Sequence, residues 1–242
     1  MPELLTRKPQ IREIIDRCLE EYPSGIPTFS KALHETLLEK KARFPLLEYA
    51  AQLLLDKIEE TDQVPLCQKI CAGHSIGGNV IIGIILQQRM VENFEESVIE
   101  AKQFIAEEAT WYGCDIIGER VFGVALLRWP EKMLPELQKM SASENQWIGR
   151  TIGPGCHYAI KKGLDALYVS QVFQLLLSMA TVKDKEVKQG IGWAAKTTAK
   201  FHPLIIEQFR SEIDNPDHVG QWFRAKVKIG LERNAHMRSK TT

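Results

Sequence analysis

Hydrophobic positions recur every three or four residues along most of the chain, and charged or polar positions lie between them. This spacing places the apolar side chains on one face of an α-helix. The clearest segments cover residues 31–41, 46–60, 79–89, 96–108 and 166–179. Since we find no convincing alternating strand and no βαβ rhythm, the pattern predicts an all-α protein.

Short breaks separate the helical segments, and most of them contain proline. Proline lacks a backbone N–H and restricts the residue before it, so helices are expected to end at or next to these positions. The breaks are Tyr22-Pro23-Ser24-Gly25, Phe44-Pro45, Trp129-Pro130, His202-Pro203 and Asn215-Pro216.

The helical pattern also repeats, weakly, at a spacing of 36 to 40 residues. Trp111 aligns with Trp147, and residues 147–150 align with residues 187–190. A helix pair of about 40 residues is the size of a HEAT repeat, and such pairs stack to bury their apolar faces. The sequence therefore predicts one HEAT-like helical-repeat solenoid over residues 1–242, with a concave binding face. A non-repetitive helical bundle is the alternative.

The composition is that of a soluble globular protein, with 242 residues, 44% hydrophobic and 26% charged. No apolar run approaches the roughly 18 residues of a membrane-spanning helix. The charged N-terminus lacks the apolar core of a secretory signal. The five cysteines are odd in number and scattered, which favours free thiols in a reducing compartment. A cytoplasmic location is expected.

The net charge is zero, but the charge is unevenly distributed along the chain. Residues 1–150 contain 17 basic and 23 acidic side chains, whereas residues 151–242 contain 14 and 8. The most basic segment is 218–242, where Glu232 is the one acidic residue beside Arg224, Lys226, Lys228, Arg233, Arg238 and Lys240. Such a segment either follows a polyanion or is a solvated tail.

Three local patterns suggest chemistry but lack the rest of a site. The glycine-rich residues 73–79 have no Walker lysine and no preceding strand, so an inter-helix turn is expected. Cys67, Cys71 and His74 have no fourth ligand at a recognisable spacing, so no metal site is expected. Residues 156–157 form a Cys-His pair, but neighbours on a helix point about 100° apart, which disfavours a nucleophile and base.

A tryptophan and an aspartate are placed to share one helix face. Trp111 and Asp115 are four residues apart. An aromatic ring beside a carboxylate is not a core pattern, because aspartate is seldom buried without a partner. The alternative is a core tryptophan with an aspartate that caps a turn or pairs with Arg120 or Arg150.

Two further segments contain residues that suit a nucleic-acid backbone. Arg150 follows Trp147 by three residues, and an arginine fork binds phosphate well. Trp193 is flanked by small residues. Small neighbours let a ligand approach the ring closely, and they equally suit a tryptophan packed between helices.

At these positions the chain resembles the DNA alkylation repair proteins of the AlkD-like, HEAT-repeat family. Residues 111–115 are similar to the family's Trp-x-x-x-Asp, and residues 147–150 to its Trp-x-x-Arg. Residues 187–203 resemble its basic residue, Ile-Gly-Trp and closing proline. Gly25-Ile26-Pro27 is a weaker match, and the resemblance covers about residues 25–210.

The resemblance implies a metal-independent, monofunctional glycosylase without a cofactor, which removes N3- or N7-alkylated purines from duplex DNA. Asp115 would stabilise the sugar cation and position the attacking water. Trp111 and Trp193 would contact the damaged nucleotide, so these three are the implied catalytic residues. The DNA-binding residues would be Arg150, Trp147, Lys188, Lys196 and Tyr22. Alkylated duplex DNA is the expected partner of a monomer, without membrane or metal.

The chain departs from the family pattern at Gly153-Pro154-Gly155, which is expected to interrupt the helix after Arg150 and alter its aim. Two other functions fit the same scaffold. One is a non-catalytic protein that binds DNA structure, and the other is a scaffold that binds protein partners on its concave face.

Overall fold

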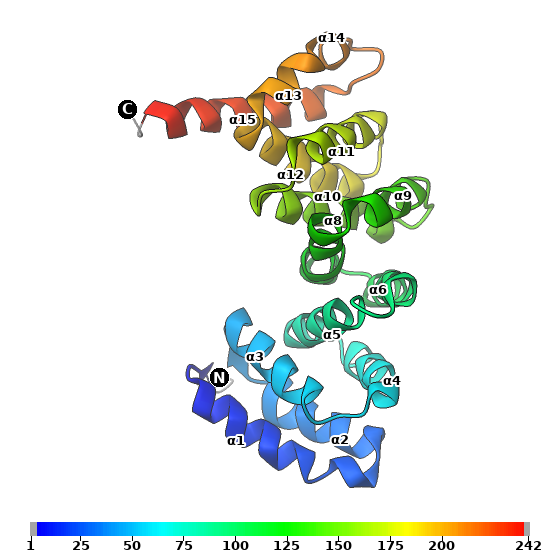
Figure 1. Ribbon diagram of the computed structural model, residues 1–242, viewed down its shortest axis with the longest axis vertical. Coiled ribbons are helices and arrows are strands. Elements are labelled where there is room, and N and C mark those ends of the chain that lie inside the picture. Colours follow the sequence, from blue (N-terminus) through cyan, green and yellow to red (C-terminus); the bar gives the residue numbers. More distant parts are fainter. Residues whose placement is uncertain (1–3, 240–242) are drawn as a thin grey trace. The chain divides into compact units, whose positions relative to one another are not determined.

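Helices make up about four fifths of the chain in the computed structural model, which describes residues 4–239 (Figure 1). Lys240 of the basic segment lies outside this range, as does the side chain of Arg238. The chain divides into two units, Met1–Val121 and Phe122–Thr242, and each is described by itself. The predicted all-α, helical-repeat-like fold is confirmed.

The described part of the first unit contains two short strands and a series of helices. Its strands are β1 (Leu4–Leu5) and β2 (Lys41–Ala42), and its helices are α1 (Lys8–Leu19), η1 (Tyr22–Ser24), α2 (Ile26–Leu33), η2 (His34–Leu38), α3 (Phe44–Leu55), α4 (Glu60–Cys71), α5 (Ile76–Arg89), α6 (Phe94–Glu108) and α7 (Trp111–Gly118). The π-helix η3 (Glu119–Gly123) contains the boundary between the units.

The second unit is entirely helical within the described residues. Its helices are α8 (Val124–Arg128), α9 (Pro130–Ser141), α10 (Gln146–Lys161), α11 (Ala166–Ser178), α12 (Lys185–Phe201), α13 (Pro203–Gln208), α14 (Arg210–Ile213) and α15 (Gln221–Ser239).

Within each unit, helices pack mainly against the helix two places along the chain. In the first unit α1, α3, α5 and α7 contact one another in succession, as do α2, α4 and α6. In the second unit the succession is α8, α10, α12 and α15, and α9 contacts α11. Two rows of alternating helices are the arrangement expected of stacked helix pairs. In the first unit, α7 belongs to the row of α1, α3, α5 and α7. In the second unit, α10 and α12 belong to the row of α8, α10, α12 and α15. These three helices carry most of the predicted site residues.

Side-chain hydrogen bonds between neighbouring repeats follow the period seen in the sequence. Tyr22 bonds Asp62, 40 residues on, and Arg150 bonds Glu186, 36 residues on. The bond from His157 to Thr197 also spans 40 residues. The spacing of 36 to 40 residues therefore corresponds to the distance along the chain between adjacent repeats.

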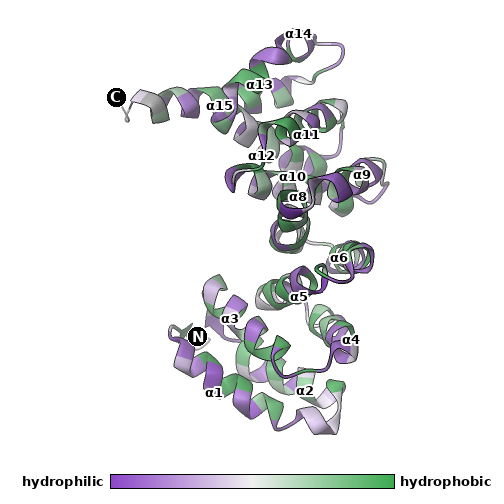
Figure 2. Cartoon of the chain, in the orientation of Figure 1, coloured by the Kyte–Doolittle hydropathy of each residue, from purple (hydrophilic) through white to green (hydrophobic). Residues whose placement is uncertain are grey.

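Each unit has an apolar core formed by the inward faces of its helices. Figure 2 shows hydrophobic and hydrophilic residues alternating along the ribbons, as amphipathic helices require. Phe29 and Leu54 are fully buried in the first unit, and Phe173 and Phe223 in the second. No helix within residues 4–239 has the length and apolar character of a membrane span.

Helices end at the proline breaks, as predicted. Two of the predicted helical segments are longer than the observed helices. α8 ends at Arg128 before Pro130, and α12 ends at Phe201 before Pro203. The segment 31–41 leaves the helix at Leu38, and β2 pairs in parallel with β1. The segment 46–60 breaks after Leu55, and Glu60 begins α4. Strands β1 and β2 are only two residues long, so they are too short to show an alternation of apolar and polar residues in the sequence.

The expected interruption at Gly153-Pro154-Gly155 is wrong, because α10 continues through Pro154 to Lys161. Proline removes only one helical hydrogen bond, to the carbonyl of Arg150. That carbonyl lies against Gly190 of α12, and a Cβ atom at Gly190 would overlap it. The close packing of α10 on α12 therefore holds a helix that the local rule alone would break.

Candidate functional site

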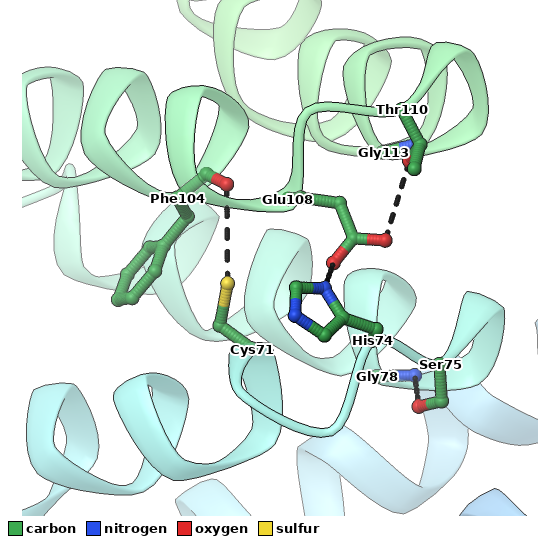
Figure 3. Close-up of polar contacts among 8 residues, drawn as sticks. All are labelled: Cys71, His74, Ser75, Gly78, Phe104, Glu108, Thr110 and Gly113. Carbon is green, nitrogen blue, oxygen red and sulfur yellow. Dashed lines mark hydrogen bonds and ion pairs between the residues drawn. The ribbon is translucent and has the colours of Figure 1, made fainter.

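The helix that carries Trp111 and Asp115 begins at a braced turn (Figure 3). Both carboxylate oxygens of the buried Glu108 are bonded. Nδ1 of His74 lies 3.1 Å from one oxygen, and the Thr110 hydroxyl donates to the other at 3.2 Å. The same hydroxyl accepts the backbone N–H of Gly113, which caps α7. The start of α7 is thus joined to the turn before α5.

Two backbone features make this turn tight. Ala109 has a φ of 49°, a left-handed conformation that costs a residue with a side chain about 1 kcal/mol or more. A Cβ atom at Gly113 would lie 2.5 Å from Cγ of Glu108, so only glycine lets the glutamate pass beneath α7. Strain held by its surroundings in this way is typical of segments that position functional groups.

Trp111 lies on the surface and is not a core residue. It is 58% exposed and packs edge-on against Tyr112, with ring centroids 5.7 Å apart. Asp115 is half-buried one helical turn later, on the same face. The core interpretation of Trp111 is therefore wrong. An exposed tryptophan on a braced helix start is a surface on which a ligand can pack.

Arg150 is buried in α10 and is engaged by an acid of the next helix in its row. Its Nη1 donates to Oε2 of Glu186 at 2.8 Å. A phosphate that bound Arg150 would have to compete with this carboxylate. Trp147, one turn earlier, is half-buried at the start of α10, where the Asn145 side chain caps the helix.

Helices α10 and α12 touch at two glycines. A Cβ atom at Gly153 would overlap the backbone of Gly190, and one at Gly190 would overlap that of Arg150. The backbones of the two helices are therefore in direct contact at Arg150 and Gly153 of α10 and at Gly190 of α12, three residues before Trp193. Gly190 serves this packing, whereas Gly192 faces Lys226 of α15.

Trp193 stacks on His157, which makes an aromatic pair between α10 and α12. The ring centroids are 4.2 Å apart and the planes are inclined by 27°. The Thr197 hydroxyl donates to the carbonyl of Trp193 at 2.9 Å, so its oxygen accepts Nδ1–H of His157 at 2.7 Å. This leaves Nε2 of the neutral imidazole as an acceptor.

Burial, together with Lys161 and Lys196, lowers the pKa of His157 to about 4 from its ordinary 6.5. Between these values the unfolded chain binds a proton that the folded protein does not. The contribution of neutral His157 to the unfolding free energy is therefore complete above pH 6.5 and is lost as the pH falls towards 4. The loss is at most about 3 kcal/mol for this half-buried group.

We therefore expect His157→Gln, which cannot titrate, to reduce the fall in unfolding free energy between pH 7 and pH 4.5. Urea unfolding of the wild type and of His157→Gln, each at pH 7 and at pH 4.5, measures this change in unfolding free energy. Other histidines contribute equally to both proteins, so an unchanged pH dependence in the variant would contradict the role assigned to His157.

The two predicted lysines lie on α12, and both are half-buried. Lys188 is in the first turn, and Lys196 follows Trp193 by three residues on the same face. Burial lowers the pKa of Lys196, and repulsion by Arg233 and Lys226 lowers it further. Cations thus gather beside the Trp193 stack.

Tyr22 is tied into the first unit by its hydroxyl. It donates to Oδ2 of Asp62 at 2.6 Å and accepts the backbone N–H of Glu59 at 3.0 Å. Burial and the Asp62 hydrogen bond raise its pKa. A DNA contact by this hydroxyl would compete with both bonds.

The cysteines do not form reactive or metal-binding groups in the described part of the chain. Burial raises the pKa of Cys71 and of Cys156 to about 12 and raises that of Cys67 further. No cluster of three potential metal ligands occurs within residues 4–239. His157 faces Trp193, so it is not paired with Cys156 as a base.

Seven of the eight predicted residues fall into two groups, one in each unit, whereas Tyr22 in η1 belongs to neither group. Trp111 and Asp115 share α7 of the first unit, whereas the second unit holds Trp147, Arg150, Lys188, Trp193 and Lys196 on α10 and α12. Reasoning from the sequence considered His157 only as a base beside Cys156, and it did not single out Glu108. The period of 40 residues aligns His157 with Thr197, so it was a signal that could have indicated their contact.

A family model described as DNA alkylation repair enzyme matches residues 79–218, more than half of the chain. The match begins within α5 and includes α7, α10 and α12 in full. No curated protein and no solved structure matches the chain. By the family match, the chain belongs to the DNA alkylation repair enzyme family.

Proposed function

We propose that the protein is a DNA glycosylase that hydrolyses the N-glycosidic bond of N3- or N7-alkylated purines in duplex DNA. The observation that carries the proposal is the pairing on α7 of an exposed Trp111 with Asp115, one turn apart on a braced helix. Family membership makes alkylated DNA the substrate class to test first.

The chemistry suits a carboxylate beside an aromatic face. Alkylation at N3 or N7 makes the purine cationic, so the base leaves readily with the electron pair of the glycosidic bond and becomes neutral. Positive charge then develops on the sugar. A carboxylate stabilises this charge, as in glycoside hydrolysis, and an aromatic face adds cation–π attraction.

In this reaction Asp115 stabilises the sugar cation and orients a water molecule. The water oxygen forms a bond to C1′ of the sugar and gives up a proton to the solvent, which leaves an abasic site and a free purine. Trp111 packs against the damaged nucleotide from the open surface of α7. No acid is needed to protonate the leaving base, because alkylation has already placed a positive charge on it.

The second unit would hold the DNA backbone. Trp193 stacked on His157 offers an aromatic surface, and Lys188 and Lys196 on the same helix supply positive charge for phosphates. Arg150 already donates to Glu186, so a phosphate there would share the guanidinium with that carboxylate or displace it. We therefore assign the DNA-binding role first to α12.

The test is analysis of free bases after incubation of the protein with methylated duplex DNA. Mass spectrometry should find more free methylated purine than the same DNA releases when it is incubated without protein. Salt-dependent binding of DNA without base release would select a non-catalytic DNA-binding protein. Absence of both at low salt would favour a scaffold for protein partners.

A further inference from the structure

The basic helix α15 presents its cations on two opposite faces. Lys226 and Arg233 are seven residues apart and share one face, whereas Arg224 and Lys228 share the other. The buried Phe223 packs within the core, and α15 contacts α12. The family match ends at residue 218, before this helix begins.

Lys226 and Arg233 lie on the side of α15 that contacts α12, the helix that carries Trp193. A Cβ atom at Gly192 would lie 3.0 Å from Cγ of Lys226, so the lysine stem crosses α12 next to Trp193. Further along, a Cβ atom at Gly230 would overlap the carbonyl of Lys196. The two helices are therefore in backbone contact beside the aromatic stack.

No carboxylate within residues 4–239 is paired with the cations on this side, although Glu232 lines a hollow beside Arg233. Lys226 and Arg233 both act on Lys196 strongly enough to lower its pKa, after burial. Within the described residues, none of the three forms an ion pair with a carboxylate. Like charges held together without a counter-charge are unfavourable, unless an anion binds between them.

A hollow of about 470 Å³ continues the row of cations along the two helices. Lys200 of α12 and Arg233 of α15 line it, together with Ile229, Glu232, His236 and Met237. From Lys226 to Arg233 the helix rises roughly 10 Å, about the length of three nucleotides of one DNA strand. The row suits an extended polyanion better than a single phosphate ion.

We infer that α12 and α15 form a phosphate-binding subsite for the DNA strand that passes Trp193. Lys226 and Arg233 contact backbone phosphates beside the one at Lys196. The inference rests on the proposed function for the choice of DNA as the polyanion. It adds to that function a second helix of the same unit as Trp193, which binds backbone phosphates of undamaged nucleotides.

The two faces of α15 provide a test variant and a matched control. Lys226→Gln with Arg233→Gln removes two charges from the proposed subsite, and Arg224→Gln with Lys228→Gln removes two from the opposite face. Fluorescence anisotropy with an undamaged duplex gives Kd between 50 and 200 mM salt. Losing two phosphate contacts should reduce the slope of log K against log salt by about 1.8. Kd at low salt should rise about ten-fold or more, while the control stays close to the wild type.

Equal losses in both double variants would show that only net charge matters and would overturn the subsite. An unchanged slope in the test variant would also overturn it, and base release by the wild type would then leave the proposed function standing. If the wild type neither binds DNA nor releases bases, the proposed function fails and the subsite with it. Should the double variant melt below the wild type, each single variant should lower the slope by about 0.9.

Discussion

Replacement of Asp115 by asparagine is expected to reduce the release of alkylated purines by about 100-fold or more, with the fold intact. Asparagine has the size of aspartate but lacks the negative charge that opposes the sugar cation. The loss of one preorganised electrostatic group costs on the order of 10²–10³ in rate. Single-turnover release from methylated duplex DNA measures the effect, and DNA affinity should change little.

The control for this prediction is Glu107→Gln, which removes a carboxylate from the exposed end of α6, outside α7. It changes the net charge by the same amount and should leave the rate close to that of the wild type. Equal rates for Asp115→Asn and the wild type would remove Asp115 from the chemistry. Equal losses in both variants would show a general effect of charge.

The largest expected loss of stability follows from Gly153→Ala. Alanine in a helix normally gains about 1 kcal/mol over glycine, so any destabilisation must come from packing. At residue 153 the new Cβ would overlap the backbone of Gly190, and neither backbone can move without separating α10 from α12. We expect a loss of about 3 kcal/mol in unfolding free energy, which urea unfolding measures.

Gly77→Ala is the matched control for Gly153→Ala. Gly77 is also helical, but its added Cβ would meet only Leu47 and Leu38 side chains at 3.4 Å or more, which is ordinary contact. This variant should be neutral or slightly more stable. If Gly153→Ala were equally harmless, the direct contact between α10 and α12 would be contradicted.

Local rules predicted the helices because helix formation depends on nearby residues. The segment 79–89 lies within α5, and residues 96–108 within α6, with ends extended by two or three residues. Proline is favoured at the first position of a helix, as in α9 and α13. The breaks at Trp129-Pro130 and His202-Pro203 could therefore be predicted from the sequence. Pro154 was misjudged because the packing of α10 on α12, 36 to 40 residues away along the chain, decides the outcome.

The candidate site was only partly readable for the same reason. Trp111 and Asp115 share a face through local helix geometry, which the spacing of four residues gives directly. Glu108 looked like one more surface acid at the end of an amphipathic segment, yet it is buried by the turn at Ala109 and by His74. The stack of His157 on Trp193 depends on the register between two repeats, which single-residue patterns do not contain.

The most direct measurement uses a duplex oligonucleotide with a single N7-methylated guanine and an excess of protein. Alkali cleavage at the resulting abasic site reports hydrolysis of that one bond. The glycosylase proposal predicts cleavage by the wild type well above the spontaneous rate of the free duplex, and a return to that rate in Asp115→Asn. The contradicting result would be obtained with two duplexes saturated by protein, one with N7-methylated guanine and one with N3-methylated adenine. If abasic sites formed in both only at the spontaneous rate, the glycosylase proposal would be wrong.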